Sequence, residues 1–428
     1  MTEGIGYLLI PFLVTLILGV PVAMSLGLGV IVYLFFTDML PFSIMTQQMY
    51  NAASSFPLMA IPFFIFAGDL MSESGITERL IGFCKILLQR VRGGLAHSMV
   101  ATGTLFAGLT GSATADTAAI IKILGPTMEK DGYDRDFTAA VAASTGVLGP
   151  IIPPSTLMIV YGAVTSASVG SMFMGGILPG ILISLGIVFV VALISHRRGY
   201  PKSNSPLTLR ILLVGLKDAS FALVMPIIII VGIRGGVFTP TEGGAVSVAY
   251  SLLIGFFVYR RLTPAKVFRS AVGSGITAAI IMLIVSACAP FGWVITFGQV
   301  PQMLAETMLS YTSNPYCVLL IMNIILLIAG LFLESAAAVL LLAPILAPLA
   351  ASVGIDPVHF GIIMCVNLCI GMITPPVGVN LFVAAPIAGV SMTAVARAIL
   401  PFLGVQLLAL MLITYIPPIT LWLPSLMR

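Results

Sequence analysis

Two groups of residues, each embedded in strongly apolar sequence, have hydroxyl groups or backbone carbonyls that could bind a hard cation such as Na⁺. Hard cations take oxygen ligands, which hydroxyl groups and backbone carbonyls supply without adding charge. The first group consists of Ser112, Thr114, Gly149, Ile152 and Ser155. The second consists of Gly330, Ser335, Gly371, Thr374 and Val377. We therefore expect two cation sites built from serine and threonine hydroxyls and from backbone carbonyls.

Two Pro-Pro pairs would release those carbonyls. Pro153 and Pro154, and later Pro375 and Pro376, interrupt apolar segments in which a membrane helix would otherwise run unbroken. An opened helix end leaves up to about four backbone groups without partners, and each costs several kcal/mol in hydrocarbon unless something satisfies it. Carbonyl ends of the half-helices favour a cation, and the amide ends that follow the breaks favour an anion.

The two interrupted regions are related by an internal repeat. A shift of 222 residues with no gap superposes the two Pro-Pro pairs and gives nine identities over the 32 positions from Ile123 to Pro154. The shared positions include Pro126 with Pro348 and Asp134 with Asp356. Paired interrupted segments in corresponding halves of a chain are typical of the binding site of a secondary transporter.

The composition is that of an all-α polytopic membrane protein. Of the 428 residues, 59% are hydrophobic and only 8% are charged, and the mean hydropathy is +1.15. Apolar stretches of roughly 20 residues are long enough to cross a bilayer. They predict ten spans near residues 4–20, 22–37, 54–73, 135–168 (broken), 171–195, 219–234, 242–260, 271–297, 356–389 (broken) and 399–423. Residues 94–128 and 314–350 carry polar interruptions at their centres and are predicted to be re-entrant helical hairpins.

The cations predict the orientation, because Lys and Arg collect in cytoplasmic loops. They cluster in residues 79–92, 130–135, 197–217 and 260–269, which all fall on one side of the predicted topology. Both termini are then outside. With five spans in each half, residues 1–205 and 206–428 form inverted repeats, with the first hairpin opening inward and the second outward. The pI of about 8.8 reflects this orientation and does not indicate nucleic-acid binding.

Six further residues could act at the hairpin tips or on a substrate. Asp116 and Glu334 are expected to lie deepest in the membrane, where an ionisable residue is a functional candidate. The alternative for each is a carboxylate that caps nearby amides. Four more polar residues near the breaks could reach a substrate or could simply form interhelical hydrogen bonds. They are Thr145, Thr156, Asn367 and Asn380.

Other interpretations of the same residues are weaker. Gly, Ser and Pro can serve only to let helices pack closely, but this does not explain two tips and two breaks related by a repeat. A channel needs a continuous polar pore, whereas these interruptions are confined to the predicted midplane. An intramembrane hydrolase needs a nucleophile with a base or a pair of carboxylates, and Asp116 and Glu334 lie on hairpins that open to opposite sides. We therefore predict no enzyme activity and no cofactor, with Na⁺ as the coupling ion.

Three segments resemble the large membrane subunit of tripartite ATP-independent periplasmic (TRAP) transporters. They are IPFFIFAGDLM from Ile61, VFTPTEGGAV from Val237, and the long stretch from Leu342 that contains GMITPPVGVN. The resemblance covers essentially the whole chain. It implies an elevator-type, Na⁺-driven importer of organic-acid anions in the bacterial inner membrane. In such a transporter the hairpins and broken helices move against a scaffold formed by the other spans.

The resemblance also implies partners and ligands. A soluble periplasmic protein would deliver the anion, and a small four-helix membrane subunit would be a separate chain, because the repeat uses all ten predicted spans. Carried over residue by residue, the family pattern adds Gly108 to the first Na⁺ site and supports the members of the two groups above other than Thr114 and Ser335. It more often has Asp where this chain has Glu334. The likeness favours sialic acid (N-acetylneuraminate) over C4-dicarboxylates as substrate. The alternative is a Na⁺-coupled carboxylate transporter that needs no binding protein.

Overall fold

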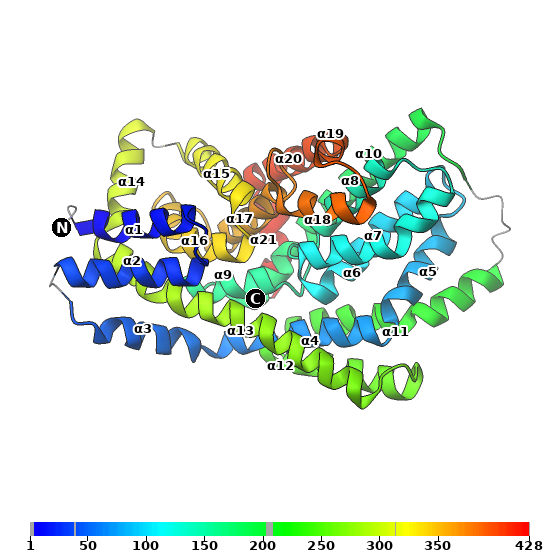
Figure 1. The fold of residues 1–428 in the computed structure, drawn as a ribbon, viewed down its shortest axis with the longest axis horizontal. Coiled ribbons are helices and arrows are strands. Elements are labelled where there is room, and N and C mark those ends of the chain that lie inside the picture. Colours follow the sequence, from blue (N-terminus) through cyan, green and yellow to red (C-terminus); the bar gives the residue numbers. More distant parts are fainter. Residues whose placement is uncertain (1–3, 38–39, 203–208, 313, 428) are drawn as a thin grey trace.

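The chain folds into a bundle of helices, and no strand occurs in the part that the structure describes (Figure 1). This structure is a computed structural model, and it describes residues 4–37, 40–202, 209–312 and 314–427. The predicted boundary between the halves at residues 205 and 206 lies outside them. The helices of the first half are α1 (Ile5–Ile17), α2 (Val22–Thr37), α3 (Ser43–Ala53), η2 (Phe56–Met59), α4 (Ala60–Glu73), α5 (Ile76–Leu88), α6 (Gly94–Thr110), α7 (Ala113–Lys130), α8 (Arg135–Gly146), α9 (Thr156–Thr165) and α10 (Val169–Arg198).

The second half follows a similar order of elements. Its helices are α11 (Leu209–Arg234), α12 (Pro240–Leu253), η3 (Ile254–Val258), α13 (Pro264–Phe297), α14 (Val300–Tyr311), α15 (Pro315–Phe332), α16 (Ser335–Ser352), α17 (Pro357–Gly371), α18 (Val379–Ala388), α19 (Met392–Ala398), α20 (Leu400–Tyr415) and α21 (Pro418–Ser425). Among the described residues, seven helices are long and apolar enough to cross a membrane, or up to nine if each of two bent pairs counts as one span. The all-α polytopic class is therefore confirmed.

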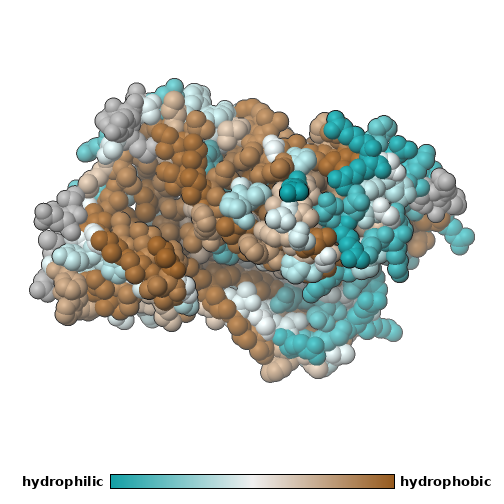
Figure 2. Space-filling view, turned by 45° about the horizontal axis from the view of Figure 1, so that its top comes forward, coloured by the Kyte–Doolittle hydropathy of each residue, from teal (hydrophilic) through white to brown (hydrophobic). Residues whose placement is uncertain are grey.

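The surface has two distinct regions. Apolar side chains cover much of the face in Figure 2, while hydrophilic side chains gather at one end. In Figure 1 that end holds the ends of α5, α7 and α10 and the start of α11. These segments carry the cations of residues 79–92, 130–135 and 197–217. The distribution is that of an apolar belt in lipid with a charged end in water.

The helix boundaries repeat with the spacing found in the sequence. Helix α7 begins at Ala113 and α16 at Ser335, which is 222 residues later, and α8 and α17 begin at Arg135 and Pro357 with the same spacing. The contacts repeat as well. Helix α9 packs against α16 and α17, and its counterpart α18 packs against α7 and α8. Each half therefore places a half-helix against the hairpin and broken helix of the other, as a two-fold relation between the repeats requires.

The first predicted hairpin is formed by α6 and α7, which reverse direction at Gly111. Gly111 has a φ of +63°, a left-handed conformation that glycine adopts without strain. Gly103 and Ile120 lie about equally far from this turn along the chain, and a Cβ on Gly103 would be 3.1 Å from Ile120 Cδ1. The two helices are therefore antiparallel neighbours. Helices α15 and α16 likewise contact one another across a short break at the second tip.

Both predicted breaks occur at the Pro-Pro pairs. Residues 147–155 separate α8 from α9, and residues 372–378 separate α17 from α18. Proline has no backbone N–H and cannot continue the ladder of helix hydrogen bonds. The Pro153–Pro154 and Pro375–Pro376 peptide bonds are cis.

Other boundaries differ from the prediction. The span predicted at 399–423 is not straight, because α20 and α21 meet at 58° where Pro417 and Pro418 remove two successive backbone donors. Helix α19 follows α18 at 113° in a stretch that was expected to be a loop. Helix α3 occupies another predicted loop; it has no buried residue and a mixed, uncharged sequence, so no long apolar run revealed it. Helix α11 begins ten residues before the predicted span.

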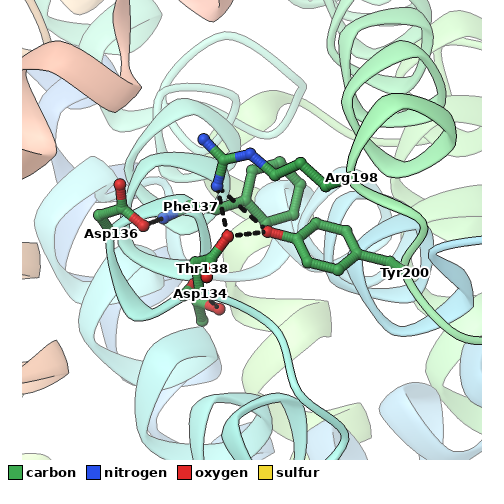
Figure 3. Close-up of polar contacts among 6 residues, drawn as sticks. All are labelled: Asp134, Asp136, Phe137, Thr138, Arg198 and Tyr200. Atoms are coloured by element: carbon green, nitrogen blue, oxygen red, sulfur yellow. Dashed lines mark hydrogen bonds and ion pairs between the residues drawn. The ribbon is translucent and has the colours of Figure 1, made fainter.

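A polar cluster ties the end of α10 to the turn between α7 and α8 (Figure 3). The Asp134 carboxylate accepts hydrogen bonds from Arg198 Nη1 at 2.6 Å and from the Tyr200 hydroxyl at 2.7 Å. Burial, with a smaller effect from this hydrogen bond, raises the pKa of Tyr200 to about 12, so its hydroxyl keeps the proton that it donates. Tyr200 also stacks on Tyr133, with 4.5 Å between ring centroids. The cluster holds the chain at the point where it leaves the first repeat.

Replacing Asp134 by Ala should lower the stability of the solubilised protein modestly. The ion pair is half exposed, so its loss is expected to cost about 1 kcal/mol. The measurement is the thermal unfolding midpoint in detergent, with Asp131→Ala as the control because Asp131 lies in the same turn outside the cluster. A midpoint that falls equally in both variants would show that the cluster adds nothing specific.

Candidate functional site

The first hairpin tip meets the first helix break directly. Thr156 Oγ1, at the start of α9, donates a hydrogen bond of 3.3 Å to the Gly111 carbonyl at the tip. A Cβ on Gly108 would lie 2.7 Å from the Pro153 carbonyl oxygen and 3.5 Å from Pro154 Cδ. The structure therefore brings both Pro residues and Gly108 together, and only glycine permits so close an approach at position 108.

Two serines of the predicted first site cap the half-helices that begin there. Ser112 Oγ accepts from the Ala115 amide at 3.4 Å and lies 3.3 Å from Thr114 Oγ1. The fully buried Ser155 accepts from the Met158 amide at 3.2 Å and donates to the Pro150 carbonyl. Ile152 lies in the same break, with its side chain against Gly180 of α10. All members of the first predicted group thus lie at one junction between hairpin and break.

Asp116 is buried at the first hairpin tip. Only 1% of it is exposed, and a Cβ on Gly149 would be 2.4 Å from Asp116 Oδ2 and 3.3 Å from the carbonyl carbon of Ser112. The missing side chain at Gly149 makes room for the carboxylate beside the break. Asp116 therefore places its carboxyl group beside Gly149 and Ser112.

At the predicted second site the backbones of two helices are in direct contact. A Cβ on Gly371 would lie 2.6 Å from Gly330 Cα and 2.7 Å from its carbonyl carbon, so α15 and α17 touch backbone to backbone. Thr374 Oγ1 donates to the Ile370 carbonyl at 2.9 Å, and this leaves its oxygen lone pairs able to bind a cation. Pro375, Pro376 and Val377 follow in the break itself.

Glu334 lies at the second hairpin tip. It is exposed and acts as the N-cap of α16, where its carboxylate accepts from the Ala336 and Ala337 amides at 3.0 and 3.3 Å. Ser335 Oγ donates to the same carboxylate at 3.1 Å. The 222-residue shift pairs Glu334 with Ser112, which caps α7 in the same way. This matches the alternative in which the acid serves as a cap, and the N-terminal helix dipole favours it.

Two of the polar residues near the breaks, Asn367 and Asn380, form hydrogen bonds between helices. Asn367 Nδ2 donates to the side-chain oxygen of Asn323 on α15 at 2.6 Å. Asn380 Nδ2 lies 3.5 Å from the Ala143 carbonyl on α8. Thr145 Oγ1 donates to the Val141 carbonyl of its own helix at 2.7 Å. All three predicted residues are buried in helix packing, whereas Thr156 reaches the first tip.

Gln406 of α20 was missed by the sequence analysis. Its Nε2 donates to the Ser144 carbonyl of α8 at 3.2 Å, and the residue is fully buried. The Leu148 amide bonds the Thr145 carbonyl instead of continuing the α-helical pattern, so an amide from the other half supplies a donor to the end of α8. The sequence feature that could have indicated its role is that it is a single glutamine within the predicted apolar span 399–423.

A cavity of about 1060 Å³ joins the two tips. Five predicted residues line it, namely Ser112, Thr114, Thr156, Glu334 and Ser335. Its other wall comes from α4, α13 and the turn between α1 and α2, and includes Asp69 and Ser72. No Lys or Arg lines the cavity in the described part of the chain. The polar groups that line the cavity are therefore mainly hydroxyls and not side-chain cations.

Comparisons with known proteins agree with this architecture. The sequence profile of the family "Tripartite ATP-independent periplasmic transporter, DctM component" matches residues 9–419. The chain is 39% identical to the C4-dicarboxylate TRAP transporter large permease protein DctM of Vibrio cholerae, covering 96% of this chain and 95% of that protein. It is 38% identical to the sialic acid TRAP transporter large permease protein SiaM of the same organism, covering 95% of each.

Two further similarities concern length and fold. The isethionate TRAP transporter permease protein DctMQ of Oleidesulfovibrio alaskensis is 39% identical over 96% of this chain, but the match covers only 65% of that longer protein. The crystal structure of the Alcanivorax borkumensis YdaH transporter superposes with a TM-score of 0.63 at 16% identity and covers 87% of each chain. The second likeness concerns the fold alone.

Replacing Gly371 by Ala should destabilise the second site. The added Cβ must push α15 away from α17, and overpacking of this kind costs about 1–3 kcal/mol. The thermal unfolding midpoint should therefore fall. Gly273→Ala in α13 is the control, because nothing lies within 4 Å of its added Cβ. Equal midpoints for the two variants would contradict the backbone contact.

Proposed function

Because the chain belongs to the DctM component family of tripartite ATP-independent periplasmic transporters, we propose that it imports an organic-acid anion together with Na⁺ by alternating access. The observation that carries the proposal is the cavity lined by both hairpin tips. Each tip lies against a broken helix, which is where secondary transporters bind substrates and coupling ions.

In this proposal two Na⁺ ions bind at the helix breaks and are transported together with the substrate. The proposed ligands are those predicted from the sequence: Gly108, Ser112, Thr114, Gly149, Ile152 and Ser155 in one site, and Gly330, Ser335, Gly371, Thr374 and Val377 in the other. Asp116 beside Gly149 makes the first site more attractive to a cation. The bound positive charge would then offset the lack of Lys and Arg around the cavity and let an anion bind.

The substrate class is an organic acid. The similar proteins are named for C4-dicarboxylates, sialic acid and isethionate at 38–39% identity, so these identities do not separate the candidates. We keep sialic acid as the first substrate to test, on the resemblance noted in the sequence. A cavity with several serine and threonine hydroxyls in its lining suits all three anions.

The proposed movement is that of an elevator. The hairpins and broken helices interlock through α9 and α18 and would move as one body against α4, α12 and α13. The cavity is lined by the Ile65–Ser72 part of α4, which is nearer the cation-rich end of that helix, and by the Thr277–Ile284 part in the middle of α13. If that end is cytoplasmic, both termini are outside and the cavity faces inward.

The partners follow from the family. We propose that a small membrane subunit is a separate chain, since the longer DctMQ relative extends beyond the match. A periplasmic binding protein would deliver the anion on the outer side of the inner membrane. The apolar surface of Figure 2 provides area for both lipid and the small subunit.

Uptake into proteoliposomes tests the proposal. Vesicles containing both membrane subunits, with the binding protein outside, should accumulate labelled N-acetylneuraminate, succinate or isethionate only when an inward Na⁺ gradient is imposed. Uptake at the same rate in choline would contradict Na⁺ coupling. Full uptake without the binding protein would favour a transporter that works alone.

Replacing Thr374 by Val should raise the Na⁺ concentration for half-maximal uptake about fivefold. The variant loses one oxygen ligand, an interaction of about 1 kcal/mol, but keeps the side-chain shape. Thr15→Val is the control, because Thr15 Oγ1 also donates to its own helix, to the Pro11 carbonyl at 2.7 Å, but lies in α1. An unchanged Na⁺ requirement in the Thr374 variant would remove Thr374 from the site.

A further inference from the structure

Asp69 of α4 is an acidic residue in the cavity wall opposite the tips. It lies within a helix long and apolar enough to cross the membrane, and it is exposed to the cavity that it lines. Its Oδ2 accepts a hydrogen bond of 2.5 Å from Ser274 Oγ of α13. This bond fixes the carboxylate between two helices of the proposed scaffold. An ionisable residue at such a place is a functional candidate.

The charge of Asp69 is not neutralised by a neighbouring cation. Among the described residues, no Lys, Arg or His forms an ion pair with it. Glu73, one turn later on the same helix, instead pairs with Lys266 Nζ at 3.4 Å. The only partner of Asp69 with a defined hydrogen bond is the neutral Ser274 hydroxyl. The cavity wall therefore carries a fixed negative charge that a substrate anion would meet.

We propose that Asp69 sets the affinity of the inward-facing cavity for its anion and so promotes release of the substrate. The inference rests on the proposed function. Asp69 belongs to the stationary wall, whereas the tips carry the substrate and its Na⁺ ions. The carboxylate faces the anion only when the tips are at this level of the membrane, so its repulsion weakens binding in this state and not on the outer side.

The expected size of the effect follows from Coulomb's law. Two like charges about 10 Å apart, in surroundings with a dielectric constant between about 20 and 80, weaken binding by about 2- to 15-fold. Neutralising Asp69 should therefore tighten anion binding to the membrane complex by this factor. Slower release should also lower the maximal rate of uptake.

The test is equilibrium dialysis of the solubilised two-subunit membrane complex in Na⁺, without binding protein. The probes are labelled N-acetylneuraminate, succinate and isethionate. Asp69→Asn should bind the transported anion about 2- to 15-fold more tightly than the wild type. Asp69→Glu, which keeps the charge, should restore the wild-type affinity. Uptake in proteoliposomes should show a lower maximal rate for Asp69→Asn only.

Two controls separate charge from packing. Ser274→Ala removes the hydrogen bond but leaves the Asp69 charge, so it should bind the anion like the wild type. Glu73→Gln removes a neighbouring charge that Lys266 already balances, and it should also leave affinity unchanged. If Ser274→Ala reproduces Asp69→Asn, or if Asp69→Asn binds no more tightly than the wild type, the inference is overturned. A wild-type complex that binds none of the three anions would instead contradict the proposed function itself.

Discussion

The structure depends on one constraint: backbone groups exposed by a broken helix must find partners where no bulk water is available. The protein meets it with several devices at each break. Side chains cap the new helix starts, Gln406 donates to the end of α8, and glycines bring a hairpin against each break. These contacts keep the breaks intact, and they leave oxygen atoms of the tips and breaks close enough together to receive a cation. The two proposed Na⁺ sites are a consequence of this arrangement.

The two repeats cap equivalent helix starts with different residues. Ser112 caps α7 and Glu334 caps α16, so only the second tip places a carboxylate in the cavity. Asp356 caps α17 through the Val358 and His359 amides, whereas its counterpart Asp134 makes no cap and instead binds Arg198 and Tyr200. The two repeats therefore share a framework, and these differences give equivalent positions of the two halves different charges and different contacts.

Much of the site was predictable because its signals are local. Pro-Pro pairs, glycines and their 222-residue spacing predict both breaks and both tips, and the helix boundaries agree. The residues that were missed depend on the tertiary fold. Gln406 and Asp69 come from helices far away in the sequence, and nothing near them indicates what they face. Glu334 was predicted to act at its hairpin tip or to cap nearby amides, and the structure shows the cap, because the helix that begins at Ser335 has free amides beside its carboxylate. Pro417 and Pro418 could have predicted the bend after α20. The prediction followed the apolar residues around them and placed one unbroken span at 399–423.

The central claim is that captured Na⁺ stabilises the paired breaks, and thermal unfolding of the solubilised protein tests it most directly. A ligand that binds only the folded state raises its stability in proportion to the logarithm of ligand concentration. The unfolding midpoint should therefore rise with Na⁺ concentration at constant ionic strength, with choline as the replacement ion. A midpoint that is the same in Na⁺ and in choline would contradict the account.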